Sequence, residues 1–262
     1  MEKIARFLRR ILISYKQNAI TSDWKAYLLF DLIPPVSQTL FFSLVAHYIY
    51  GPVQLKKWMI GNAILMASFT ALFGVGTQLV TEKYHGTLSL VMASKTRLHE
   101  VLLSSTISAM AFSLISVSLG LSLVSLLLGI SWTLELILAF AVILLVAVFV
   151  AMSFGYVFSC LILVTSETNM ILNVTSRILL IFTGANFPIE RLPIGLQGIS
   201  RFLPLTRTIQ VAQAVIEGDV LSAHYQLLGE EVLVGIVFIL LGAFLMTVME
   251  RQARKTGRME FV

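Results

Sequence analysis

The feature that most constrains this chain is a series of six long apolar stretches separated by short polar segments. A transmembrane helix needs about 20 mostly apolar residues to cross a hydrocarbon core about 30 Å thick. The six stretches cover, approximately, residues 27–50, 58–80, 101–130, 133–164, 169–187 and 232–249. Only 13% of the 262 residues are charged, against about 25% in an ordinary soluble domain. The sequence therefore predicts an all-α membrane protein with six transmembrane helices, and it argues against a soluble enzyme or a nucleic-acid-binding domain.

The distribution of basic residues predicts how the chain is oriented in the membrane. Cytoplasmic segments of membrane proteins carry an excess of Lys and Arg. Most of the 19 basic residues fall in the segment before the first stretch, the loop between the second and third stretches, and the tail. Both termini are therefore expected in the cytoplasm, which agrees with an even number of spans.

The N-terminal segment 1–22 has the pattern of an amphipathic helix. Ile4, Phe7, Leu8 and Ile11 recur at helical spacing and share one face, and the lysines and arginines lie on the other face. Such a helix lies on the membrane surface and is attracted by anionic lipid. We expect an interfacial helix on the inner leaflet. Packing of the same face against a partner protein remains the alternative.

Segment 188–229, before the last stretch, is too apolar for a free loop and is interrupted by proline. It contains Pro188, Pro193 and Pro204, three of the six prolines of the chain. Since proline is poorly tolerated in a helix beyond its first turn, we expect short helices here that enter the membrane partway or cap it.

The sequence lacks the motifs of several membrane activities. It contains no phosphate-binding loop of the form G-x-x-x-x-G-K-[ST], no G-x-S-x-G motif and no H-E-x-x-H pair. The single cysteine, Cys160, and the four dispersed histidines offer no metal-ligand spacing. We therefore expect no catalytic residue, no metal site and no ATP-binding site in this chain. An intramembrane lipid-modifying enzyme is a further alternative, but no nucleophile–base pair supports it.

Polar residues in the fifth stretch form one candidate translocation path. Asn169, Asn173 and Arg177 share one helical face, and Arg177 lies about 12 Å along the axis from Asn169. An arginine at that depth faces a partner or a water-filled cavity, or else its side chain reaches back to the inner interface. Both interpretations remain open from the sequence.

The second stretch carries a weaker polar stripe that could form another wall of the same path. Its members are Asn62, Thr70, Phe73 and Thr77.

Two motifs give the chain a family resemblance. The run from Thr81 to Leu90, in the loop after the second stretch, resembles the E-x-x-x-G-T-L signature of ABC-2 type exporter permeases. The segments 184–188, 192–193 and 204–206 resemble the S-G-x-x-F-P…L-P…P-L-T pattern that precedes the last helix of that family. Ser89, Lys95, Thr183 and Gln213 depart from the usual residues. The drug and antibiotic branch resembles this chain more closely than the polysaccharide branch.

The resemblance implies a single ABC-2 type transmembrane domain over residues 1–262. Within it, 1–22 would be the interfacial helix, 27–187 the first five spans, 188–229 the extracellular and re-entrant segment, and 230–262 the last span with a cytoplasmic tail. Gly184, Pro188, Pro193 and Pro204 would belong to the re-entrant motif.

The resemblance also implies a function. The chain would be the permease subunit of an ATP-driven exporter in the inner (plasma) membrane of a prokaryote, moving a drug, antibiotic, peptide or lipid-like substrate by alternating access. Two separate ABC ATPase subunits would bind ATP and Mg, and a second permease half, identical or related, would complete the path. A cytoplasmic coupling helix would dock on an ATPase through Glu82, Lys83, Tyr84, Gly86, Thr87 and Leu88. A non-transporting sensor or immunity subunit with an ATPase partner is the alternative.

Overall fold

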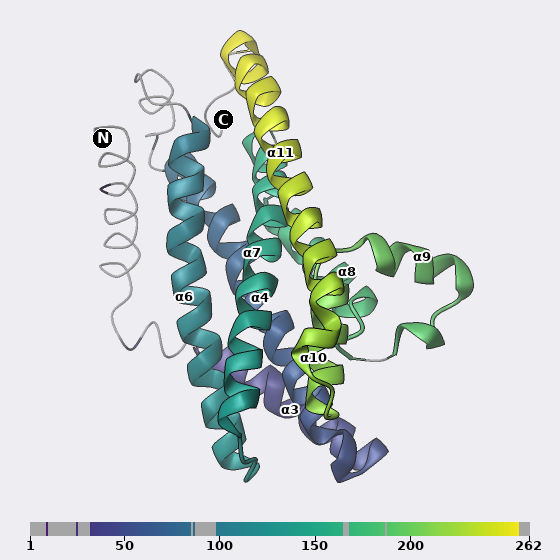
Figure 1. The fold of residues 1–262 in the computed structure, drawn as a ribbon. Helices are drawn as coiled ribbons and strands as arrows, with labels where there is room; N and C mark the ends of the chain where they lie inside the picture. Colours follow the sequence, from purple (N-terminus) through teal and green to yellow (C-terminus); the bar gives the residue numbers. More distant parts are fainter. Residues whose placement is uncertain are drawn as a thin grey trace.

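The structure, a computed structural model, describes residues 32–84, 86, 98–164, 168–186 and 188–256, together with Arg9 and Lys25. These residues form eight α-helices, two short 3-10 helices and no strand (Figure 1). The elements are α3 (Ile33–Tyr50), α4 (Pro52–Tyr84), α6 (Leu98–Leu127), α7 (Leu134–Val164), α8 (Thr168–Phe182), η2 (Ile189–Arg191), α9 (Ile194–Phe202), α10 (Thr206–Ile216), η3 (Leu221–His224) and α11 (Tyr225–Thr256). Apart from Arg9, the expected interfacial helix 1–22 lies outside the described residues.

Helix length separates the elements into two groups. Helices α4, α6, α7 and α11 have 30 to 33 residues, or about 45–50 Å at 1.5 Å per residue, which exceeds the hydrocarbon core. Among the described residues, 134–161 in α7 and 221–249, from η3 into α11, are both long and apolar enough to cross a membrane. By contrast, α3 and α8 have 18 and 15 residues, or about 27 and 22 Å. The all-α membrane architecture is thus supported, while six complete spans remain a prediction.

Glycine and proline explain two of the helix boundaries. Pro34 and Pro35 lie in the first turn of α3, where a missing amide hydrogen breaks no helical bond. Helix α8 ends at Phe182, five residues before the expected end at 187. Gly184 follows with φ +82°, a conformation that glycine adopts without the steric cost of a side chain.

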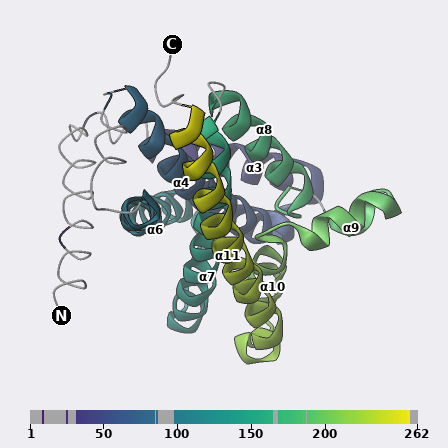
Figure 2. The same cartoon turned by 90° about the horizontal axis from the view of Figure 1, so that it is seen from above.

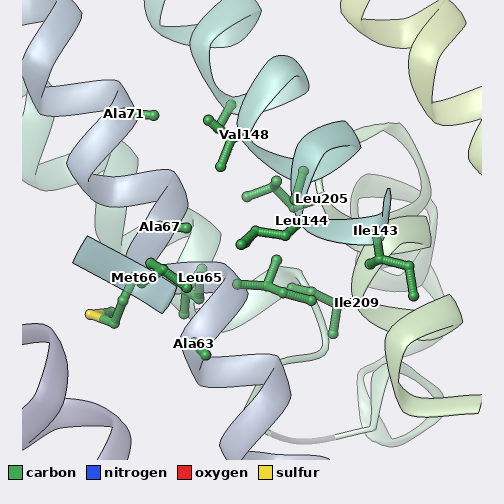
Figure 3. Packing of buried hydrophobic residues seen from close by; sticks show 14 of the residues in the cluster. Ala63, Leu65, Met66, Ala67, Ala71, Ile143, Leu144, Val148, Leu205 and Ile209 are labelled. Atoms are coloured by element: carbon green, nitrogen blue, oxygen red, sulfur yellow. The ribbon is translucent and has the colours of Figure 1, made fainter. Parts of the chain in front are cut away.

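Helices α4 and α7 form the centre of the bundle. Helix α11 packs along α7, while α3 and α6 pack against α4. Figures 1 and 2 show α4, α6, α7 and α11 along the length of the bundle and α9 extending away from it. In Figure 3, apolar side chains from α4, α7 and α10 meet in the core, among them Ala63, Leu65, Leu144, Val148 and Ile209.

Helices α4, α7 and α11 run in one direction and α6 runs in the other, so the bundle has two distinct ends. The end of α4, the start of α6 and the end of α11 lie together at the top of Figure 1, which we call the Gly86 end. The junction of α3 and α4, the turn between α6 and α7, and α10 lie at the opposite end, which we call the α10 end.

Two glycines allow α11 to approach α7 closely. A Cβ atom added at Gly242 would lie 2.5 Å from Cδ1 of Tyr156, and one added at Gly235 would lie 2.7 Å from Cε1 of Phe149. Cys160 also lies in this interface, with its Sγ 3.4 Å from the carbonyl oxygen of Gly242. Small residues at helix interfaces in membranes permit such close backbone contact.

We therefore predict that Gly242→Ala lowers the melting temperature of the detergent-solubilised protein. Overpacking of this kind costs about 1–3 kcal/mol. Gly229→Ala is the matched control, because Gly229 also lies in α11 but has no neighbouring atom within 4 Å of an added Cβ. Equal melting temperatures for the two variants would show that the α7–α11 contact tolerates a side chain.

A buried carboxylate attaches α10 to α11. The side chain of Glu231, in α11, is fully buried and accepts a hydrogen bond from the backbone amide of Leu205, the residue before α10. Its second oxygen lies 3.3 Å from Nη1 of Arg207, and Nε of Arg207 lies 3.2 Å from the neighbouring Glu230. Leu205 has φ +76°. The carboxylate thus pairs with an amide at the start of α10, where amides lack helical partners and the helix dipole favours negative charge.

We predict that Glu231→Ala is much more destabilising than Glu230→Ala. The first variant leaves a buried amide without its acceptor and removes a buried ion pair, at a cost of about 3–5 kcal/mol. The second removes a partly exposed ion pair worth about 1 kcal/mol or less. Glu231→Gln should fall between them, because its carbonyl can still accept from Leu205. Thermal unfolding checks the order, and equal losses at 230 and 231 would contradict the proposed attachment.

Candidate functional site

The predicted polar stripe of the fifth stretch lies on the outer face of α8. Asn169, Asn173 and Arg177 are exposed, and Nδ2 of Asn173 donates to the carbonyl oxygen of Asn169 at 2.7 Å. Within the described part of the chain, the guanidinium of Arg177 forms no ion pair. Ser176, the residue before Arg177, is buried, and its hydroxyl donates to the carbonyl oxygen of Leu172 at 2.8 Å. The stripe therefore lies on the surface of the described part of the chain and not in its interior.

The polar residues of α4 are mostly turned toward the protein interior. Asn62 is fully buried and donates from Nδ2 to the carbonyl of Trp58 at 3.0 Å, while its Oδ1 has no hydrogen-bond partner. Thr70 and Phe73 are half-buried, and Thr70 bonds the carbonyl of Met66 at 3.1 Å. Thr77 belongs to α4, but its side chain lies outside the described part. Asn62 is thus placed in the core and does not line an open path in this structure.

The residues expected to contact an ATPase lie at the Gly86 end. Glu82, Lys83 and Tyr84 are the last three residues of α4, which continues without interruption past the expected end of the second span at 80. Gly86 follows in a turn with φ +65°. Thr87 and Leu88 lie outside the described residues. The first half of the motif therefore extends the long helix and does not begin a separate one.

Short helices occupy the proline-containing segment. Pro188 and Pro193 immediately precede η2 and α9, and the buried Pro204 lies between α9 and α10. Helix α11 begins at Tyr225, earlier than the expected start of the last span at 232. The sequence correctly indicated short helices here, and their depth in the membrane remains a prediction.

A cavity of about 360 Å³ opens at the α10 end. It lies among the end of α3, the start of α4, residues 183–191 and α10. Nε2 of Gln213 donates to the carbonyl of Gly184 at 3.2 Å, and Nζ of Lys57 lies 2.7 Å from Oε1 of Glu217. These two contacts connect α10 to segment 183–191 and to α4, respectively.

Sequence reasoning singled out neither this cavity nor the buried Glu231. Lys57 and Glu217 are 160 residues apart and belong to no shared motif, so only the folded chain brings them together. Glu231 could have been suspected only because a carboxylate stands inside a strongly apolar helix. Within the described ranges, no group of His, Cys, Asp and Glu residues could hold a metal ion.

Comparison with known proteins identifies the family. The family model described as ABC-2 type transporter matches residues 10–216. This range includes the Glu82–Leu88 motif, the polar stripe of α8 and all of α10, while a comparison with curated proteins found no match. Since the matched range covers well over half of the sequence, the chain belongs to the ABC-2 type transporter family.

Proposed function

We propose that this chain is the permease subunit of an ATP-driven exporter that moves a drug, antibiotic, peptide or lipid-like substrate by alternating access. Membership of the ABC-2 family implies the permease component of an ABC transporter, a membrane protein that works with an ABC ATPase. Direction and substrate class are proposals, as is the absence of ATP hydrolysis by the chain itself. The observation that supports a transport path is the exposed polar face of α8.

The charge of Arg177 makes lipid an unfavourable neighbour for this face. An arginine at the centre of a membrane helix costs about 2.5–3.5 kcal/mol or more if lipid surrounds it. Arg177 lies about 13 Å along the axis from the start of α8. Its Cα–Cβ bond is tilted toward the start of the helix, so the guanidinium would have to span this distance to leave the lipid. A second permease copy or close homologue, placed against α8, would surround Asn169, Asn173 and Arg177 with protein and water. Such a pair would have a polar path between its two halves.

The Gly86 end has the features expected of the cytoplasmic side. Basic residues such as Arg251 and Arg254 follow the apolar part of α11 there, and the motif around Glu82 lies at the same end of the bundle. Since α4 is continuous over 33 residues, force applied by an ATPase near Gly86 would reach the α10 end directly. We infer from these features that both termini lie inside and the α10 end outside, in the plasma membrane of a prokaryote.

Substitution of Arg177 tests the proposed path. Arg177→Ala should reduce ATP-dependent transport about tenfold or more, because fixed positive charge is lost from the path, whereas Arg177→Lys should retain part of the activity. The control is Ile178→Ala, an exposed apolar neighbour on α8. The measurement is uptake, into vesicles with the Gly86 end outward, of a fluorescent amphiphile that the wild type moves, normalised to inserted protein. Wild-type transport by Arg177→Ala would remove this face from the path.

Substitution of two glycines that share a backbone conformation tests whether the Gly86 end couples the chain to the ATPase. Gly86 and Gly129 have φ values of +65° and +64°, and neither has an atom within 4 Å of an added Cβ. A side chain in this conformation costs about 1–2 kcal/mol at either position. Gly86→Ala should weaken the association with the ATPase and its stimulation, while Gly129→Ala, at the opposite end, should leave both unchanged. Equal effects would place coupling elsewhere.

The same preparation separates the exporter from its alternative. Purified permease would be reconstituted with its partner ABC ATPase and tested with a panel of fluorescent amphiphiles. ATP-dependent accumulation of any of them supports the exporter. Ligand-stimulated ATP hydrolysis without accumulation would favour a sensor or immunity subunit.

A further inference from the structure

The cavity at the α10 end has the size of a headgroup site. Its volume of about 360 Å³ lies at the low end of the range of about 300–1,000 Å³ that is typical of ligand pockets. It can enclose a small polar group but not a whole amphiphile. An amphiphile that uses it must therefore leave its chains outside.

The charges around the cavity are balanced. Lys57 and Glu217 already pair with each other across it. Glu190 and Arg191 lie on η2 at the rim, both are exposed, and neither forms an ion pair among the described residues. One negative and one positive group thus remain available, which suits a ligand that carries both charges better than a simple anion or cation.

Neutral polar groups add to this balance. Gln54 and Gln210 line the cavity without a hydrogen bond to another described side chain, and the side-chain oxygen of Gln213 stays available while its amide group bonds Gly184. Glutamine amides offer both donors and acceptors. The amide groups of Gln54 and Gln210 would donate to the phosphate and ester oxygens of a headgroup, and the side-chain oxygen of Gln213 would accept from its ammonium group, without adding net charge.

The neighbouring residues place the cavity at the boundary between lipid and water. Tyr50 and Trp58, both in the lining, stack with their ring centroids 5.5 Å apart, and these two residue types concentrate at membrane interfaces. Helix α9 begins three residues after Arg191 and exposes Ile194, Ile199 and Phe202. Figure 2 shows α9 extending away from the bundle, as suits a helix that lies in the interfacial plane.

We propose that this cavity binds the headgroup of a zwitterionic phospholipid of the phosphatidylethanolamine class. Arg191 supplies the positive charge for the phosphate and Glu190 the negative charge for the ammonium group, while glutamine amide groups donate to the remaining oxygens. The acyl chains leave the cavity along the apolar side of α9. This site requires only that the chain is embedded in a membrane, so it is independent of the direction of transport and of the polar face of α8.

Lipid retention by the full-length purified permease tests the proposal. The protein would be extracted in mild detergent and incubated with equal amounts of phosphatidylethanolamine and phosphatidylglycerol, and bound lipid would be counted by native mass spectrometry. Soluble phosphoethanolamine would be added as a competitor in a parallel sample. The wild type should retain the zwitterionic lipid about fivefold better, the ratio expected from one partly exposed charge contact.

Three variants and a control assign the binding to this cavity. Ala214→Phe fills the cavity from α10 and should abolish the preference. Glu190→Lys should shift it toward phosphatidylglycerol, and Arg191→Glu should lower retention of both lipids. Val220→Phe, exposed and outside the lining, should behave as the wild type. If Ala214→Phe fails to fold, the two exposed rim variants still decide the matter.

Several results would overturn the proposal. Equal retention of the two lipids by the wild type would show that the balanced charges select nothing. An unchanged preference in Glu190→Lys together with unchanged retention in Arg191→Glu would place the lipid elsewhere on the protein. Complete displacement of the lipid by phosphoethanolamine alone would identify a site for a soluble zwitterion and not for a membrane lipid.

Discussion

Helix α4 contacts α3, α6, α7, α8 and α10, and the arrangement of the bundle depends on how closely these neighbours approach it. Gly155 of α7 sits against α4, where an added Cβ would lie 3.3 Å from the Cα atom of Leu72. Gly61 of α4 leaves similar room for the backbone of Ala185. Lipid provides no hydrophobic drive for helix association, so close packing of this kind is a main source of cohesion. Displacing α4 would disturb each of its neighbours.

The long helices could be predicted from the sequence because apolar length is a direct requirement of the bilayer. The prolines likewise indicated short helices between Pro188 and Pro204, since proline restricts where a helix can continue. The end of the fifth helix was placed too late. The structure ends the helix at Phe182, and Gly184 follows with a positive φ that is incompatible with a right-handed helix.

The candidate site was predictable only in part. Helical spacing correctly grouped Asn169, Asn173 and Arg177 on one face, but it gave no information about what covers that face. Spacing also could not reveal that Asn62 is buried in the core. The contacts around α10 could not be predicted from the sequence for another reason. The Lys57–Glu217 and Glu231–Leu205 pairs join segments that are distant in the chain, and they belong to no local sequence pattern.

The attachment of α10 to α11 through Glu231 has a mechanical consequence. With its start held by a buried carboxylate, α10 would follow α11 as a rigid body. Helix α11 is 32 residues long, or about 48 Å, so a tilt of about 5° about its far end would carry α10 sideways by about 4 Å. Lys57 belongs to α4 and would not move with α11, so the movement of Glu217 would separate this ion pair. A small rotation begun at one side of the membrane would thus break a contact at the other.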